Sequence, residues 1–82
     1  MKSFHICTHA VITIGGPEQG TVAVERVPRQ ETVKYLRRYC DTVDSSTWDV
    51  VSAWVMSDAR EIGDTYEVED HASDTVASIV LV

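Results

Sequence analysis

The residues that most resemble a metal site are the alternating His5, Cys7 and His9 near the start of the chain. Imidazole and thiolate groups are common zinc ligands, and His71 or Cys40 would offer a fourth. Alternate residues of a strand lie about 7 Å apart, however, so three of them span about 13 Å. The ligands of one zinc ion all lie about 2 Å from it. We therefore predict no metal site.

Thiol catalysis is the next chemistry to weigh, because the chain contains two cysteines, Cys7 and Cys40. Cys40 falls on the apolar stripe of a predicted helix, where burial favours the neutral thiol. No orienting third residue accompanies either cysteine. We expect both to be reduced thiols in a cytoplasmic protein, although one disulfide is arithmetically possible. The segment GGPEQG at 15–20 lacks the Gly-Lys-Ser/Thr ending of a phosphate loop, so it predicts a hairpin turn. We predict no catalytic or cofactor-binding residue and no enzyme.

Charge is the most distinctive property of the sequence. The 82 residues carry a formal net charge of −6. Residues 1–40 hold six Lys or Arg against three Asp or Glu, whereas residues 41–82 hold Arg60 against ten Asp or Glu. The two halves of the chain therefore differ in sign.

Seven carboxylates of the second half form the predicted partner-binding surface. They are Asp58, Glu61, Asp64, Glu67, Glu69, Asp70 and Asp74. Their spacing does not match a calcium-binding loop, and catalytic carboxyls would need a concave site that a small domain rarely offers. The alternatives are an ordinary solvated strand face and an acidic recognition surface.

The four cations Arg29, Lys34, Arg37 and Arg38 could form a phosphate-binding ridge on the predicted helix. The strongly negative remainder of the chain would repel a polyanion, and no aromatic platform lies among these residues. We therefore expect a solvated helix face or a protein contact, and no direct nucleic-acid binding.

The elements that position these residues follow from hydrophobic periodicity. Alternation predicts strands over 3–14 and 21–27, joined by the glycine-rich turn. Spacings of three and four predict a helix over 27–41, with Val33, Leu36 and Cys40 on the buried stripe. Residues 48–62 fit either a second helix, capped by Ser46 or Thr47 and ended by Gly63, or a buried strand. Strands over 64–70 and 75–82 complete the chain.

These elements predict an α+β fold of order ββααββ, or ββαβββ if 48–62 is a strand. We expect a small two-layer sandwich, mainly an antiparallel sheet with one or two helices on one face, over a single domain of residues 1–82. No apolar run approaches the roughly 20 residues that span a bilayer, so we expect no membrane partner. The first residues lack a signal-peptide pattern, which favours the cytoplasm.

Short length, one predicted domain, acidic balance and no catalytic motif together give a profile that resembles the small phage-encoded anti-defence proteins, the anti-CRISPR group in particular. The resemblance rests on no shared motif. It implies a non-catalytic inhibitor in the host cytoplasm that blocks DNA contacts or nuclease recruitment of a host complex. Fixed carboxylates would then occupy a basic groove built for nucleic-acid phosphates. The alternative is a homo-oligomeric assembly module, pairing through the uncharged terminal strand at 78–82 if that strand lies at a sheet edge.

Overall fold

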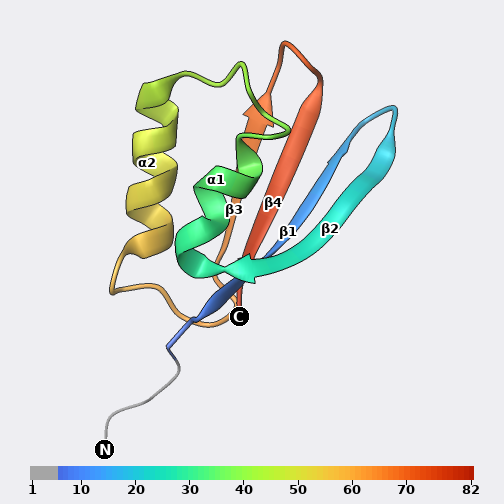
Figure 1. Ribbon diagram of the computed structural model, residues 1–82. Helices are drawn as coiled ribbons and strands as arrows, with labels where there is room; N and C mark the ends of the chain where they lie inside the picture. Colours follow the sequence, from blue (N-terminus) through green and yellow to red (C-terminus); the bar gives the residue numbers. More distant parts are fainter. Residues whose placement is uncertain (1–5) are drawn as a thin grey trace, which may run out of the picture.

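Two β-hairpins lie side by side in the computed structural model, which describes residues 6–82 (Figure 1). The strands are β1 (His9–Gly16), β2 (Gly20–Pro28), β3 (Thr65–Asp70) and β4 (Thr75–Leu81). They form one antiparallel sheet in the order β2-β1-β4-β3. The hairpin of the first half and the hairpin of the second half are thus joined through β1 and β4, and the outer strands β2 and β3 lie at opposite edges.

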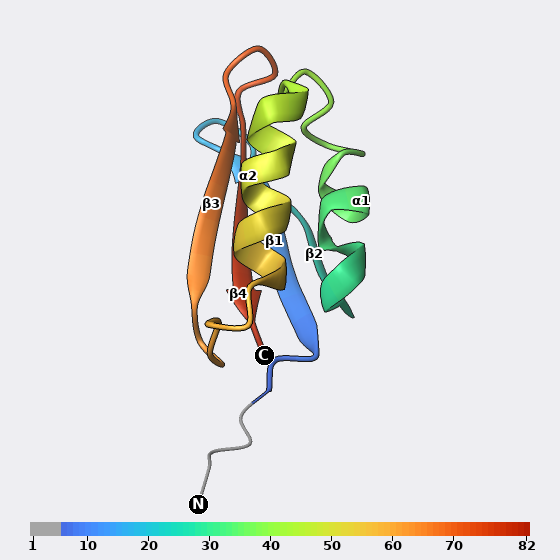
Figure 2. The ribbon, with the colours of Figure 1, turned by 90° about the vertical axis from the view of Figure 1, so that its left-hand side faces the viewer.

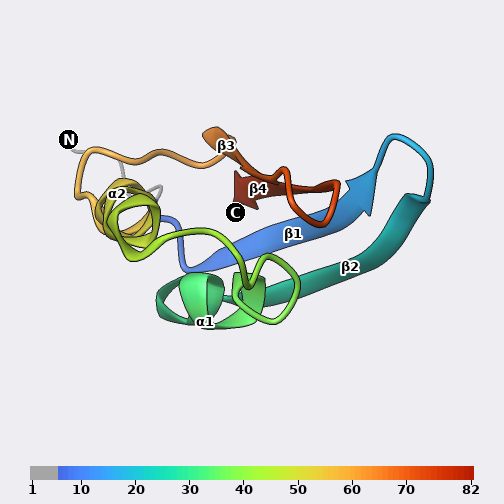
Figure 3. The same ribbon diagram turned by 90° about the horizontal axis from the view of Figure 1, so that it is seen from above.

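The helical segments connect the two hairpins and lie on one face of this sheet (Figures 2 and 3). They are a 3-10 turn at Arg29–Glu31, α1 (Thr32–Leu36) and α2 (Ser45–Met56). The α+β class and the ββααββ order are confirmed, and 48–62 does contain a helix.

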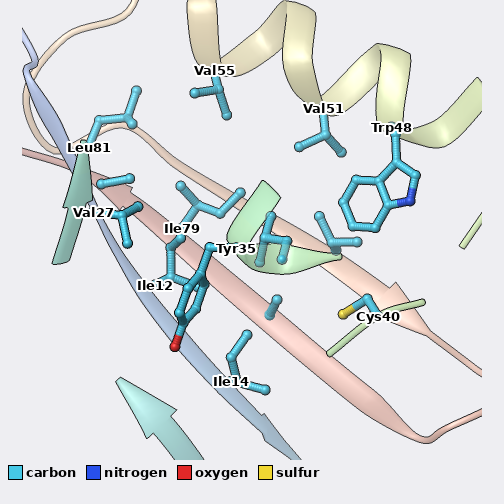
Figure 4. Close-up of a cluster of buried hydrophobic side chains, with 14 of the residues drawn as sticks. Ile12, Ile14, Val27, Tyr35, Cys40, Trp48, Val51, Val55, Ile79 and Leu81 are labelled. Atoms are coloured by element: carbon cyan, nitrogen blue, oxygen red, sulfur yellow. The ribbon is translucent and has the colours of Figure 1, made fainter. Parts of the chain in front are cut away.

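The core lies between α2, α1 and the inner face of the sheet (Figure 4). Ile12 and Ile79, from the two central strands, are fully buried beneath Val51 and Val55 of α2. Leu36 of α1 is also fully buried. Alternate residues of β1 and β4 supply this face, as the period-2 pattern requires.

The bounds predicted for the first helix, residues 27–41, are wrong. Val27 and Pro28 are the last two residues of β2, and Pro28 keeps an extended backbone, so helical geometry begins only at Arg29. The predicted stripe is nevertheless buried at Leu36 and Cys40, because the amide of Cys40 donates to the Leu36 carbonyl at 2.9 Å. The helical turn continues loosely to Cys40 although α1 itself ends at Leu36.

The second helix is shorter than predicted and shifted toward the N-terminus. Its cap is Asp44, whose carboxylate accepts a hydrogen bond of 3.0 Å from the Thr47 amide, rather than Ser46 or Thr47. The helix ends at Met56, and Gly63 lies in the following loop with a φ of +96°. The amide of Gly63 donates a hydrogen bond of 2.7 Å to the carbonyl of Leu81. Gly63 therefore helps to place the loop that leads into β3, and it does not end α2.

The alternation predicted for 3–14 holds from His9 onward and fails before it. Cys7 is 2% exposed and Ile6 is 70% exposed, which is the reverse of the expected facing. The amides of Thr8 and His9 both donate to the same Val82 carbonyl, at 3.0 and 3.1 Å, so the ladder is irregular there. The predicted strand residues before residue 6 lie outside the described part of the chain.

The terminal strand β4 lies inside the sheet, with β1 bonded to one edge and β3 to the other. The suggestion that residues 78–82 pair with a second copy through a free edge is therefore wrong. The predicted turn between the first two strands is confirmed as residues 17–19.

Candidate functional site

Within residues 6–82, the exposed cations are confined to one side of the molecule, whereas exposed carboxylates occur on both sides. In the part of the chain that the structure describes, all exposed Lys and Arg belong to β2, α1 or the turn after α1, and we call them the basic side. They are Arg26, Lys34, Arg37 and Arg38. We call the exposed carboxylates of α2, β3 and their connections the acidic side. They are Asp49, Asp58, Glu61, Glu67, Glu69 and Asp74. The other exposed carboxylates of the described chain lie elsewhere, at Glu18, Glu25 and Glu31 in the first half and at Asp41 and Asp44 between the two helices. Because β2 and β3 are the two edges of the sheet, Arg26 of β2 and the carboxylates of β3 lie at opposite edges (Figure 3).

Glu67 and Glu69 hold the middle of the acidic side. They pair with Ser78 and Val76 across β3 and β4, so both project from the face that no helix covers. Both side chains are exposed, and they lie about 7 Å apart along the strand. The sequence placed these two carboxylates correctly on one face.

The loop between α2 and β3 holds three of the predicted carboxylates at one end of the sheet. Asp58 and Glu61 are exposed. Asp64 is turned inward on the loop, where its carboxylate accepts a hydrogen bond of 2.9 Å from the Glu61 amide and lies 3.9 Å from Arg60. Asp64 is therefore partly neutralised and fixes the loop.

Asp74 lies at the other end of β3, in the turn that leads to β4, with a φ of +54°. The seven predicted residues thus run along the length of β3 and do not converge on one point.

Asp70 does not belong to the exposed surface, and this part of the predicted site is wrong. The residue is 3% exposed and shares the inner face with Val68. Its carboxylate accepts hydrogen bonds from the hydroxyl and the amide of Thr42, and from the amides of Ala72 and Ser73. These hydrogen bonds, led by the Thr42 hydroxyl, hold the pKa of Asp70 below its ordinary value. Asp70 joins the turn after α1 to the β3–β4 turn.

A shallow hollow of about 310 Å³ lies beside Asp70, between the connection of the two helices and the start of the β3–β4 turn. Asp44 and Glu69 line it together with His71. The Asp44 carboxylate is used as the helix cap, which lowers its pKa, and His71 Nε2 lies 3.4 Å from Glu69 Oε1 on the surface. Carboxylates with a lowered pKa are hydrogen-bond acceptors at neutral pH rather than acid catalysts.

The cysteines and histidines considered for metal or thiol chemistry are placed apart. Cys7 is buried while His9, two residues on, is partly exposed, and His5 lies outside the described residues. Within residues 6–82 no group of three or more potential ligands could hold a metal ion. Burial, with the nearby charges of Asp70 and Asp41, raises the pKa of the Cys40 thiol to about 11. Cys40 is therefore a neutral thiol at physiological pH.

The uncovered face of the sheet is a feature that the sequence reasoning missed. We call it the open face, and its central residues are Val11, Thr13, Val76, Ser78 and Val80, with Val22 and Val24 on the edge strand β2. Val22 and Val24 are 53% and 61% exposed. A signal for it existed, because apolar residues occupy both alternating sets of positions in the segment that becomes β4.

No protein-family model matches the chain, and no curated protein or solved structure gives a significant match. Among the described residues, no helix has the length and apolar character needed to cross a bilayer.

Proposed function

We propose that this protein is a non-catalytic inhibitor that binds, through its acidic side, a basic nucleic-acid-binding or recruitment surface of a host defence complex. This is the mode of action implied by its resemblance to the anti-CRISPR proteins, and it places the protein in the cytoplasm of the host. The observation that supports the proposal is that, within residues 6–82, the acidic side contains exposed carboxylates and no exposed Lys or Arg.

The physical argument is electrostatic. A groove that binds nucleic acid is lined with Lys and Arg, and a rigid strand that displays Glu67 and Glu69 can place fixed negative charges in it. The basic side lies at the far edge of the sheet, so its cations do not neutralise these carboxylates within the same molecule. The resulting dipole also orients the protein as it approaches a positive surface, which raises the association rate at low salt.

The titratable side chains support binding over bond-making chemistry. The Cys40 thiol is buried and protonated at neutral pH, and the carboxyl groups of Asp44 and Asp70 are held ionised by hydrogen bonds within the fold. Each group thus has a structural environment that opposes a catalytic role.

The test is an affinity capture from host lysate with two matched variants. The first, Asp58→Asn/Glu61→Gln/Glu69→Gln, removes three carboxylates of the acidic side. The second, Lys34→Gln/Arg37→Gln/Arg38→Gln, removes three cations of the basic side. We expect wild type and the second variant to retain a nucleic-acid-handling complex and to inhibit its binding of nucleic acid. We expect the first variant to bind about tenfold or more weakly, because three close charge contacts are lost.

Competition separates the proposed mode from an unrelated contact. Excess DNA or RNA should displace the wild-type protein from the captured complex, since both would use the same basic surface. The proposal is wrong if a captured partner binds the acidic-side variant as tightly as wild type, or if nucleic acid and the protein bind that partner together.

A further inference from the structure

The open face of the sheet carries five valines around Thr13 and Ser78, although no part of the described chain covers it. Both helices pack on the other face (Figures 2 and 3). An antiparallel sheet that faces water on one side usually presents polar residues there. Here the two central strands and β2 present valines, and Val24 is 61% exposed. A contiguous apolar surface bordered by polar residues is typical of an interaction site.

The strand register gives this face a defined charge pattern. One row of neighbouring residues runs Arg26, Val11, Val80 and Thr65, from β2 across to β3. The next row runs Val24, Thr13, Ser78 and Glu67. A cation therefore lies at the β2 border and carboxylates lie at the β3 border, with valines, Thr13 and Ser78 between them.

Arg26 and Glu67 have no ionic partner among the residues that the structure describes. Within residues 6–82 neither side chain lies within ion-pair distance of an opposite charge, whereas Glu69 lies 3.4 Å from His71. The two borders of the open face thus carry free charges of opposite sign.

We propose that a second copy of the chain covers the open face, packed sheet against sheet about a two-fold axis that runs parallel to the strands. This axis places β2 of each copy over β3 of the other. Arg26 then faces the partner copy's β3 and can reach Glu67 one residue pair along that strand, since packed sheets lie about 10 Å apart and both side chains are long. The valines of the two copies meet between the two ion pairs.

The charges also exclude the other simple packing. A two-fold axis that crosses the strands would stack β3 on β3, which would bring the Glu67 and Glu69 carboxylates of the two copies together. Like charges that face each other across an interface are destabilising. A second copy fits better than a uniformly basic partner, because such a partner would leave Arg26 facing a like charge. The open face carries both the cation and the carboxylates that pair with each other across the interface, and a two-fold interface requires such a self-complementary surface.

The dimer does not depend on the proposed inhibition, but it would occupy Glu67, so only the dissociated copy would offer that carboxylate to a basic groove. Asp58 and Glu61 lie in the loop after α2, outside the open face, and remain available to another partner in both copies. Four strands about 4.8 Å apart give a face only about 20 Å wide, so a small interface with a dissociation constant in the micromolar range is expected.

The test uses the purified full chain alone, by sedimentation equilibrium between about 5 and 500 µM, a range that covers weak interfaces of this size. We expect wild type to form dimers. Arg26→Glu alone and Glu67→Arg alone should each weaken the dimer about tenfold or more, because each brings like charges together twice. An equal mixture of the two variants should restore association as a heterodimer, because both contacts then join opposite charges.

Two further variants keep the result interpretable. Val24→Lys, at an exposed apolar position of the open face, should also abolish the dimer, whereas Lys34→Glu on α1 should leave it unchanged. All these positions are exposed, and circular dichroism with thermal unfolding verifies that each variant folds. The proposal is overturned if wild type remains monomeric over the whole range, if both charge variants dimerise like wild type, or if the mixture fails to restore association.

Discussion

The guanidinium of Arg29 donates a hydrogen bond of 2.6 Å from Nε to the main-chain carbonyl of Val55, near the end of α2. The same group reaches the Ser57 carbonyl at 2.6 Å and the Cys7 carbonyl at 3.3 Å. The last carbonyls of a helix have no partner within the helix, and a cation is favoured at this end. Arg29 therefore ends α2 and joins it to the first helical turn and to the start of the sheet, so it is not part of the basic side.

Replacing Arg29 by Lys should destabilise the protein by about 2 kcal/mol, because an ammonium group cannot span three carbonyls and buried acceptors lose their donor. Chemical denaturation monitored by tryptophan fluorescence measures this. Arg37→Lys, at an exposed position in the turn after α1, is the matched control and should change stability little. Equal stabilities of the two variants would show that the Arg29 contacts contribute nothing.

The contact of Asp70 with Thr42 gives a second prediction, on acid stability. Because the native pKa of Asp70 is lowered, its contribution is present above the ordinary carboxyl pKa of 3.8 and is lost as the pH falls through the lower native value. Asp70→Asn should lower the unfolding midpoint by roughly 10 °C at pH 7, and the difference from wild type should shrink below about pH 4.

Asp74→Asn is the control for Asp70, because it neutralises an exposed carboxylate only four residues away. It should leave the midpoint nearly unchanged at either pH. A difference between Asp70→Asn and wild type that stays constant down to pH 2 would contradict the assignment of the acid effect to this carboxylate.

Much of the fold follows from periodicity, and the errors have identifiable physical causes. The inward placement of Asp70 could have been predicted from the sequence, since Asp70 shares the alternating set of positions with Tyr66 and Val68. The start of the first helix could not, because Val27 suits a strand and a helix stripe equally and only its pairing with Ala10 decides. Strand pairing is a long-range property that no local pattern specifies.

The candidate site shows the same limit. The count of charged residues located the acidic half of the chain. The strand order, which places β3 at one edge of the sheet, then determines where the carboxylates of that half lie. Which carboxylates face solvent depends on partners that lie far away in sequence, as with Asp70 and Thr42, separated by 28 positions. The open face required the strand order as well, because apolar residues on both sides of a strand fit a fully buried strand equally.

The buried thiol of Cys40 gives a third prediction. Its pKa of about 11 stands two units above the ordinary 9.0, so its thiolate fraction near pH 8 is reduced about 100-fold. In a Cys7→Ala variant, which isolates Cys40, the native protein should react with a disulfide reagent about 100-fold or more slowly than free cysteine. The unfolded protein should react at the ordinary rate. Rapid labelling of the native variant would show that Cys40 is accessible and ionised.

The glycine at position 16 gives the last prediction, on the junction of the two hairpins. A Cβ atom at Gly16 would collide with the main-chain carbonyl oxygen of Asp74, in the turn between β3 and β4. Main chain cannot move aside as a flexible side chain can, so Gly16→Ala should separate the end of β1 from that turn. We expect a loss of about 1–3 kcal/mol in the free energy of unfolding.

Glu18→Ala, two residues on in the exposed hairpin turn, is the matched control and should be nearly neutral. Denaturant titration of both variants measures the difference, and a Gly16→Ala variant as stable as Glu18→Ala would mean that the two turns do not need this close approach.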